Sequence, residues 1–274
     1  MVNIGVIGYG NMGSMIAGNI LKLDLLLDDE KLFVSNHNLS KLDNLKEIYP
    51  SVTVTSDNKF LAENCEVIII CVKTPSFLNV LGEIKPFLKE DVHIVTSCAG
   101  VDFDEIGEVY TGGLSIVIPS LASYVTQVSN IASNTRRKGI SLFYHNSDVS
   151  NLEKNFIEGL FDEFSFVKVI DNYDDLNIAT ILTSCSPAFL ALLVSKLADI
   201  GVNNSSLSKD EFVYMIIKTM IGSGHVLDSE FEIEDVISRV ATPGGITQEG
   251  LDFLEEEISE DGEELFEILL KKYE

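Results

Sequence analysis

The chain has 274 residues, which is enough for one large domain or for a nucleotide-binding domain with a smaller partner. Hydrophobic residues make up 46% and charged residues 23%, a balance typical of a globular protein and not of a disordered one. Asp and Glu outnumber Lys and Arg by 43 to 19, and the resulting charge of −24 argues against binding to nucleic acid or anionic lipid. Much of the acidic excess lies in residues 252–267, where we expect a solvated helix face.

The cysteines and histidines are too dispersed to predict a metal site or a disulfide framework. They are Cys65, Cys71, Cys98, Cys185, His37, His93, His145 and His225. The N-terminus enters an apolar strand directly, without the pattern of a secretory leader. The longest apolar runs, such as residues 67–72, are too short to span a bilayer. We therefore expect a soluble cytoplasmic protein with reduced thiols and no metal.

The first 170 residues alternate between short apolar runs and segments with helical periodicity. Strands are predicted at residues 2–8, 31–35, 67–72, 92–97, 116–118, 140–145 and 166–170. Helices are predicted at residues 11–25, 77–87, 103–109 and around 152–161. Alternation of this kind predicts an α/β fold with a doubly wound sheet, and residues 1–170 are interpreted as a dinucleotide-binding Rossmann domain.

The pattern changes near residue 171, after which only helical periodicity is found. The apolar residues that follow it are Leu190, Leu193, Val194, Leu197, Phe212, Met215, Ile216, Met220, Leu251, Leu254 and Ile258. Residues 171–274 are therefore interpreted as an all-helical domain for substrate binding and dimerisation. Several apolar helices in about a hundred residues often complete their burial across a dimer interface, so we expect a homodimer or a larger assembly.

A glycine-rich loop follows the first predicted strand and opens the first predicted helix. Gly8 permits a tight turn, Gly10 lets the backbone approach a pyrophosphate, and Gly13 allows the helix to pack closely on the strand. The free N–H groups of Asn11, Met12 and Gly13 at the helix N-terminus would then bind the phosphates. The order strand, loop, helix and second strand predicts a nicotinamide dinucleotide site.

The end of the second predicted strand bears on the choice between NAD and NADP. An Asp or Glu at this point favours NAD, but the chain has Ser35, Asn36 and His37, followed by Asn38 and Lys41. No carboxylate would repel a 2′-phosphate, and hydroxyl, amide and cationic donors could hold one. The segment favours NADP, with NAD as the alternative; an ordinary polar turn is the other interpretation.

Several segments resemble pyrroline-5-carboxylate reductase, in order along nearly the whole chain. One similarity is to that family's Val-Lys-Pro turn, which corresponds here to Cys71-Val72-Lys73 followed by Pro75. A second is to its Leu-Ala-Asp-Ala-Gly stretch, which corresponds to residues 197–201 (LADIG). Residues 242–247 (TPGGIT) resemble its Ser-Pro-Gly-Gly-x-Thr loop. The resemblance implies a Rossmann domain joined to a helical dimerisation domain, with Val72 and Lys73 at the cofactor.

The loop at residues 242–247 has a chemistry that can be read from its residues. Pro243 fixes φ, Gly244 and Gly245 expose backbone N–H groups, and Thr247 is predicted to cap a helix that begins near residue 248. Such a nest suits a small carboxylate, although a plain Pro-Gly turn is the alternative. The resemblance implies that Thr242 and Thr247 donate to the substrate carboxylate.

Thr180 aligns with a family threonine placed near the ring nitrogen of the substrate. A threonine hydroxyl is a poor acid, so hydrogen bonding or proton relay is its expected catalytic role. The alternative interpretation is that Thr180 is simply a small residue at a contact between helices.

Two segments depart from the family pattern. Met-Pro-Asn-Thr-Pro, beside the nicotinamide in the family, is replaced by Ile118-Pro119-Ser120-Leu121-Ala122. Ser-Gly-Ser-Gly-Pro-Ala-Tyr is replaced by residues 183–189 (TSCSPAF), so two glycines have gained side chains at Ser184 and Ser186. These changes bear on the identity of the substrate more than on cofactor binding.

Three hypotheses for the function follow. The leading one is an NAD(P)H-dependent reductase of a cyclic imino acid, 1-pyrroline-5-carboxylate or a close relative, without a metal or a nucleophile. The runner-up is a reductase-like protein that binds dinucleotide, has lost catalysis and serves in regulation or interaction. The third, a β-hydroxyacid dehydrogenase, needs a catalytic Lys on the first helix after the domain junction, and none occurs between residues 171 and 194.

Overall fold

The computed structural model describes residues 2–101, 103–123 and 139–273, and its two compact units are Met1–Ser184 and Cys185–Glu274. The strands are β1 (Ile4–Ile7), β2 (Leu32–Ser35), β3 (Thr53–Thr55), β4 (Val67–Ile70), β5 (His93–Thr96), β6 (Leu114–Pro119), β7 (Gly139–His145) and β8 (Ser165–Val169). The helices of the first unit are α1 (Asn11–Lys22), α2 (Asp43–Ile48), α3 (Asn58–Asn64), α4 (Thr74–Ile84), α5 (Phe103–Val109), α6 (Asn151–Asp162) and α7 (Tyr173–Thr180), with the shorter turns η1 (Leu39–Leu42), η2 (Lys85–Phe87) and η3 (Leu121–Ser123).

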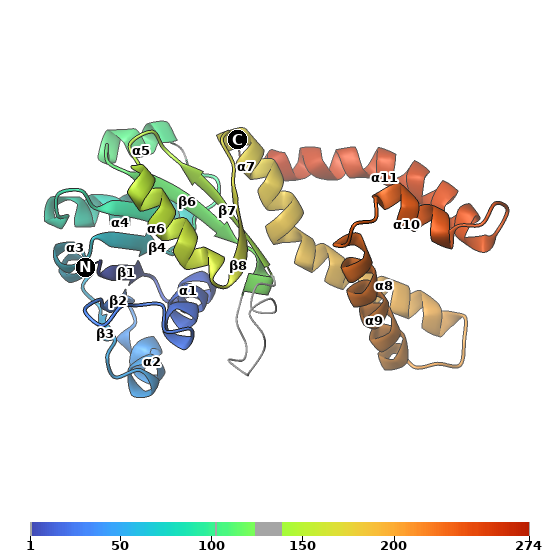
Figure 1. Ribbon diagram of the computed structural model, residues 1–274, viewed down its shortest axis with the longest axis horizontal. Helices are drawn as coiled ribbons and strands as arrows, with labels where there is room; N and C mark the ends of the chain where they lie inside the picture. The colour runs from blue at the N-terminus through green and yellow to red at the C-terminus, as the bar shows by residue number, and fades with distance from the viewer. Residues whose placement is uncertain (1, 102, 124–138, 274) are drawn as a thin grey trace. The chain divides into compact units, whose positions relative to one another are not determined.

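The eight strands form one sheet in the order β3-β2-β1-β4-β5-β6-β7-β8 (Figure 1). Strands β1 to β6 pair in parallel, β7 is antiparallel to β6, and β8 is parallel to β7. The first six strands have the order of a dinucleotide-binding fold, whose connections reverse direction between β1 and β4. The predicted fold class is confirmed, and β3 is a strand that the sequence pattern did not predict.

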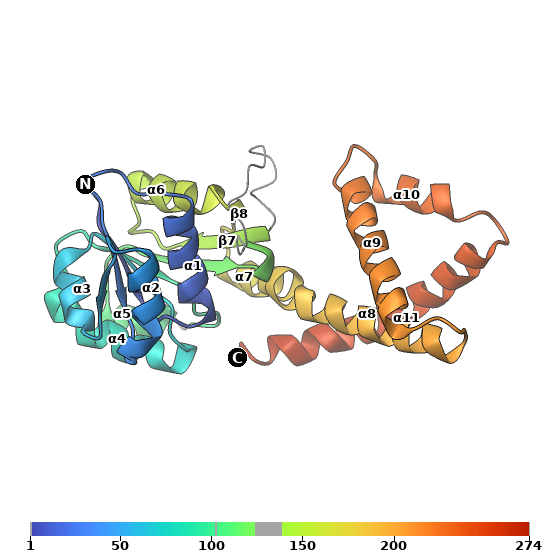
Figure 2. The ribbon, with the colours of Figure 1, turned by 90° about the horizontal axis from the view of Figure 1, so that it is seen from below.

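Helices cover both faces of the sheet and give it two hydrophobic cores (Figures 1 and 2). One core joins the sheet to α1, α2 and α6 through residues such as Ile16, Leu45 and Phe161. The other joins it to α3, α4, α5 and α7, with Phe77 and Leu176 among its members. Burial on both faces explains why β1, β2, β4, β5 and β6 consist of fully buried residues, as in parallel sheets generally.

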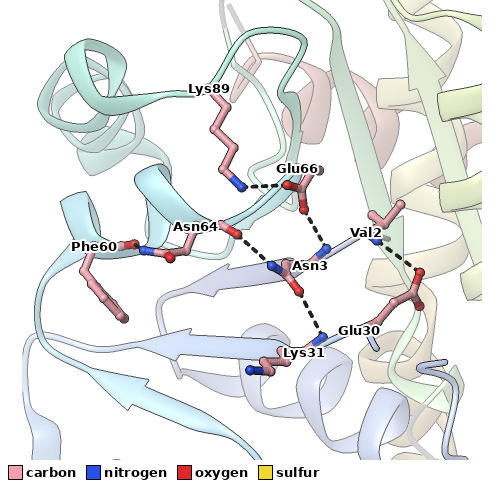
Figure 3. A network of polar contacts seen from close by, with 8 residues as sticks. All are labelled: Val2, Asn3, Glu30, Lys31, Phe60, Asn64, Glu66 and Lys89. Atoms are coloured by element: carbon pink, nitrogen blue, oxygen red, sulfur yellow. Dashed lines mark hydrogen bonds and ion pairs between the residues drawn. The ribbon is translucent and has the colours of Figure 1, made fainter. Parts of the chain in front are cut away.

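A polar network holds together the amino ends of β1, β2 and β4 (Figure 3). The Asn3 side chain donates to the carbonyl of Asn64 at 2.9 Å and accepts from the N–H of Lys31 at 3.1 Å. The Asn3 N–H donates to Glu66 at 2.7 Å, and Glu66 pairs with Lys89 at 2.6 Å. This network fixes the amino ends of these strands. Dinucleotides bind at the opposite, carboxyl ends in such folds.

The second unit is entirely helical in the residues that the structure describes. It contains α8 (Ser186–Asn203), α9 (Lys209–Leu227), α10 (Ile233–Val240) and α11 (Ile246–Leu270), and the π-helical turn η5 (Ile181–Cys185) leads into it. Helices α8 and α9 pack against each other. Many other apolar side chains remain exposed, for example Leu193 on α8 at 51% and Leu254 on α11 at 49%. So much exposed apolar surface indicates an interface with another chain.

One helical stretch, residues 173–203, is long and apolar enough to cross a membrane by length and composition, because an 18-residue window within it has a mean hydropathy of 1.9. The sequence prediction that the longest apolar runs are too short to span a bilayer did not cover such a helix. It considered only uninterrupted apolar runs, and it missed that α7, η5 and α8 follow one another as continuous helix.

A hollow of about 490 Å³ lies within the second unit, along α10 and α11. Ile237, Leu251, Leu254 and Ile258 give it an apolar lining, with Gln248, Glu255 and Ser259 beside them. It adds to the apolar surface of this unit.

Candidate functional site

The glycine loop between β1 and α1 has the geometry of a phosphate cradle. Gly8 has φ +95°, and a Cβ on it would lie 2.5 Å from the carbonyl oxygen of Cys71. A Cβ on Gly13 would lie 1.8 Å from the carbonyl oxygen of Gly8, so only glycine allows α1 to approach the loop. A Cβ on Gly10 would meet no described atom within 4 Å, which leaves open space above the loop. The turn at Gly8 and the close packing at Gly13 agree with the sequence prediction, while the approach of a pyrophosphate to Gly10 stays a prediction.

The first amides of α1 are oriented to bind an anion. The helix begins at Asn11, and its first backbone hydrogen bond runs from Ser14 to Gly10 at 2.9 Å. The N–H groups of Asn11, Met12 and Gly13 precede that bond, and the Gly10 N-cap has no side chain to bind them. Amides without an intrahelical partner and the helix dipole suit the pyrophosphate of a dinucleotide, so the loop fits the cofactor that the sequence predicts.

Asn36 ties the glycine loop to the end of β2. Its Oδ1 accepts from the N–H of Tyr9 at 3.1 Å, and its Nδ2 donates to the carbonyl of Asn38 at 2.8 Å. The residue is 5% exposed, so these bonds form away from bulk water. Its observed role is to position the loop, a role that the sequence did not reveal.

Ser35 and His37, two further residues predicted to contact the cofactor, lie in opposite environments. Ser35 is fully buried, and its hydroxyl bonds to the Oδ1 of Asn58 at the start of α3. His37 is exposed, as is Lys41 in η1. The structure thus leaves His37 and Lys41 available to a 2′-phosphate, while the Ser35 hydroxyl is used inside the protein. Asn58 was missed because it lies 23 residues further along the chain.

Val72 and Lys73 form the turn between β4 and α4, directly beyond the switch point of the sheet. The Val72 carbonyl accepts from the Cys98 thiol at 3.1 Å, and Lys73 occupies the N-cap position of α4 and is exposed. Cys71 lies beneath the glycine loop, and burial raises the pKa of its thiol to about 12. That thiol stays protonated and has a structural role.

The segment that follows β6 forms a tight corner, Ser120–Ser123. The Ser120 N–H donates to the carbonyl of Ile140 at 2.8 Å, and its Oγ accepts from the Ile140 N–H at 3.1 Å. Asn19 of α1 donates from Nδ2 to the Ser123 carbonyl at 2.9 Å. Asn19 was not among the predicted residues, because nothing in the sequence relates it to a residue 104 positions away.

Thr180 ends α7, where the chain enters the π-helical turn η5. It is 5% exposed, and its hydroxyl donates to the carbonyl of Leu176 at 2.7 Å, which leaves the oxygen able to accept. Thr183 donates in the same way to the carbonyl of Ala179 at 2.8 Å. The Ser184 Oγ is buried and has no hydrogen-bond partner among the residues that the structure describes. Single π-helical turns often occur at functional sites.

The loop at residues 242–247 lies between α10 and α11 in the second unit. Gly244 has φ +73°, and the Gly245 N–H donates to the Thr242 carbonyl at 2.9 Å. Helix α11 begins at Ile246 with Gly245 at the N-cap, which has no side chain to cap it. The prediction that Thr247 caps this helix is therefore wrong, because the helix starts one residue before it. The amides of Ile246, Thr247 and Gln248 precede the first backbone hydrogen bond of this helix, from Glu249 to Gly245, so the anion nest at this end stays a prediction.

The structure brings most of the predicted cofactor residues together at the carboxyl ends of the strands. The glycine loop, the β2 end, the turn at Val72 and Lys73, and the corner after β6 all follow the carboxyl ends of strands. The loop at residues 242–247, the predicted carboxylate site, belongs to the other unit. Among the described residues, no group of three His, Cys, Asp or Glu side chains is arranged to hold a metal ion.

Two family models match the chain. One, for pyrroline-5-carboxylate reductase dimerisation, covers residues 174–266. The other, described as NADP oxidoreductase, coenzyme F420-dependent, covers residues 3–100. The first match includes most of the apolar helical stretch 173–203, so its exposed surface falls within a dimerisation domain.

Similar structures share the fold over nearly the whole chain. A Streptococcus pyogenes 1-pyrroline-5-carboxylate reductase has a TM-score of 0.80 at 22% identity, covering 99% of this chain and 98% of that one. The Plasmodium falciparum enzyme with NADP bound has a TM-score of 0.78 at 24% identity, covering 99% and 97%.

Sequence relatives are closer. The pyrroline-5-carboxylate reductase of Methanobrevibacter smithii is 39% identical over 255 residues, covering 93% of this chain and 97% of that protein. Pyrroline-5-carboxylate reductase 3 of Bacillus subtilis is 32% identical, covering 100% and 96%. The B. subtilis ComE operon protein 4 is 26% identical over the same extent. With this identity and coverage, the chain belongs to the pyrroline-5-carboxylate reductase family.

Proposed function

We propose that this protein reduces 1-pyrroline-5-carboxylate to proline with NADPH. The observation that carries the proposal is the pair of uncapped helix N-termini, at Asn11 for a diphosphate and at Ile246 for a carboxylate, in a chain of this family. The nicotinamide, when bound, supplies a hydride to the C=N carbon, and the ring nitrogen takes a proton. NADPH, a proton and the imine thus give NADP⁺ and the amine.

The cofactor residues take distinct roles in this proposal. The amides of Asn11, Met12 and Gly13 hold the pyrophosphate, with Gly8 and Gly10 giving it room. Val72 and Lys73 border the site at the switch point. His37 and Lys41 contact the 2′-phosphate, and Asn36 and Ser35 support them from within. The NADP found in the P. falciparum structure supports this choice, and NAD remains the alternative cofactor.

The residues proposed for the substrate carboxylate lie in the second unit, whereas Thr180 lies at the end of α7 in the first. Gly244 and Gly245 shape the nest at the start of α11, and Thr242 and Thr247 add hydroxyl donors for the carboxylate. Thr180 acts through its free acceptor lone pairs, and so it bonds to the protonated ring nitrogen of the substrate. In this assignment residues 1–170 bind the dinucleotide and residues 171–274 bind the substrate and dimerise.

The assembly is a homodimer formed by the helical domain, in a cytoplasmic protein. A second copy would cover the exposed apolar side chains of α8, α9 and α11, which the described part of the second unit leaves uncovered. A covered surface of this kind also accounts for the apolar stretch 173–203 without a membrane.

A steady-state assay tests the function. Purified protein is mixed with NADPH and 1-pyrroline-5-carboxylate, the oxidation of NADPH is followed by its absorbance, and the product is identified as proline. We expect turnover of about 1 s⁻¹ or faster. Tight NADPH binding without proline formation would favour the second candidate, a dinucleotide-binding relative that has lost catalysis. The departures from the family pattern at residues 120–122 and 184–186 motivate this candidate.

A further inference from the structure

The corner Ser120–Ser123 follows the carboxyl end of β6 and is held from two sides. From the strand side, Ser120 exchanges two hydrogen bonds with Ile140 of β7, at 2.8 and 3.1 Å. From the helix side, Asn19 donates to the Ser123 carbonyl at 2.9 Å. A strand and a helix that are far apart in the sequence therefore both fix this corner.

The Asn19 contact is buried at both ends. Asn19 and Ser123 each have 0% of their surface exposed. An amide on an apolar helix face costs free energy unless it is hydrogen-bonded, so the bond to Ser123 offsets the cost of burying this side chain. Without the Asn19 donor, the Ser123 carbonyl would lose a buried partner, and the corner would move to regain one.

Gly139, the neighbour of Ile140 in β7, also lies against the corner. A Cβ at this residue would lie 2.4 Å from the Ser123 nitrogen and 2.6 Å from the Ser120 Oγ. The corner therefore has no spare room, and a single methyl group on Gly139 must displace it.

The corner lies on the nicotinamide half of the sheet. In a fold with the strand order 3-2-1-4-5-6, the two mononucleotide halves bind on either side of the switch point. The β2 end, where the ribose 2′ position is read, belongs to the adenosine half, so the ends of β4, β5 and β6 receive the nicotinamide half. Ser120 is the first residue beyond β6.

We propose that Asn19 is a positioning residue of the reductase, which fixes the Ser120–Ser123 corner against α1 and thereby sets the placement of the nicotinamide ring. The inference rests on the proposed function. It links the helix that binds the pyrophosphate to the backbone at the other end of the same cofactor, through one buried side chain.

Three variants test this proposal. Asn19→Leu removes the donor at nearly equal volume, and Gly139→Ala displaces the corner from the opposite side. Asn3→Ala is the matched control, because it removes the two side-chain hydrogen bonds of an asparagine at the amino ends of the strands, opposite to the site. For each, we measure kcat, KM, the NADPH Kd, and the fluorescence of bound NADPH without substrate.

We expect Asn19→Leu and Gly139→Ala to lower kcat by about 10- to 100-fold, since a displacement of about 1 Å is enough for that. The NADPH Kd should stay within about threefold of wild type, because the pyrophosphate contacts at α1 are unchanged. The emission of bound NADPH should shift in both variants. Asn3→Ala should lower only the melting temperature.

Wild-type kcat and emission in both corner variants would overturn the proposal, as would an equal change in Asn3→Ala. If Asn19→Leu does not fold, Asn19→Ala together with Gly139→Ala provides the same test. A wild-type protein that binds NADPH but does not form proline would refute the proposed function alone. The emission shift, which needs no turnover, would then decide the positioning role.

Discussion

The Oδ1 of Asn36 accepts a hydrogen bond from the backbone N–H of Tyr9 at 3.1 Å. This bond ties the residue between the first two glycines of the loop to the end of β2, and the Nδ2 of the same side chain holds the carbonyl of Asn38. One buried side chain thus holds the glycine loop and the segment after β2 in a fixed relative position.

Asn36→Leu should weaken NADPH binding by about tenfold, because it removes both of these hydrogen bonds and leaves the Tyr9 N–H without its acceptor. Isothermal titration with NADPH measures the change. Asn64→Ala is the control, since its side-chain amide bonds to the carbonyl of Phe60 in its own helix, away from the glycine loop. Equal affinities in the two variants would show that Asn36 does not hold the loop.

Replacing His37 and Lys41 together by Ala should lower kcat/KM for NADPH by about 10- to 100-fold while NADH is little affected. In the proposed function these exposed residues contact the 2′-phosphate, and a hydrogen bond to a charged group contributes about 1.5–3 kcal/mol. Ser35→Ala should instead lower stability and retain the cofactor preference, since its hydroxyl is buried against Asn58. The assignment would be contradicted if the preference for NADPH over NADH changed in Ser35→Ala and not in the double variant of His37 and Lys41.

Gly244→Val should raise the KM for the imino acid by about tenfold or more and leave the NADPH Kd unchanged. The residue has φ +73°, a conformation that costs a β-branched residue about 1–2 kcal/mol or more, so the nest must distort. Gly250→Ala in α11 is a suitable control, because its new methyl group meets no described atom within 4 Å. An unchanged KM in Gly244→Val would place the carboxylate elsewhere.

Leu193→Asp should convert the proposed dimer to monomers in size-exclusion chromatography with light scattering. A charge on an apolar helix face that is buried between two copies costs several kcal/mol. Leu152→Asp on α6 changes an equally apolar residue that is 82% exposed in the first unit and should leave the mass unchanged. A dimer that survives Leu193→Asp would move the interface away from α8.

Two buried histidines predict a loss of stability in mild acid. Ser115 Oγ lies 2.7 Å from the Nε2 of His93 and 2.6 Å from the Nδ1 of His145, and burial lowers the pKa of each histidine from 6.5 to about 4. Between these values the unfolded chain binds protons that the folded chain does not, so the free energy of unfolding falls as pH drops from about 6.5 to about 4. Each histidine contributes up to about 1.4 kcal/mol per pH unit.

Urea unfolding of wild type and of His93→Gln/His145→Gln at several pH values measures this effect. The groups around the pair, Glu153, Lys154, Glu158 and Tyr110, are the same in both proteins. The difference between the two curves therefore isolates the histidines. Parallel curves between neutral pH and the folded-state pKa would refute the prediction.

The sequence predicted the sheet well because the buried strands are continuous apolar runs. β3 escaped prediction because Thr53–Thr55 is a three-residue strand at the edge of the sheet, half-buried and without an apolar run. The reversal of β7 was also invisible, since a strand's direction depends on which neighbour it pairs with and not on its own periodicity.

The site was predictable where backbone conformation alone defines it. The glycine motif requires residues without a side chain at Gly8, Gly10 and Gly13, and the motif agrees with the geometry of the loop. The roles of Ser35, Asn36 and Asn19 depend on partners at Asn58, Tyr9 and Ser123, which only the folded chain brings near. Thr247 was misassigned because helix boundaries move by a residue or two around glycines.

The most direct test of the proposed function is the conversion of 1-pyrroline-5-carboxylate, with proline quantified against NADPH consumed. We expect one proline per NADPH, with faster turnover for NADPH than for NADH, and loss of both in a Gly13→Val variant, whose side chain would collide with the Gly8 carbonyl. A protein that binds NADPH tightly and yet forms no proline at any substrate concentration would contradict it.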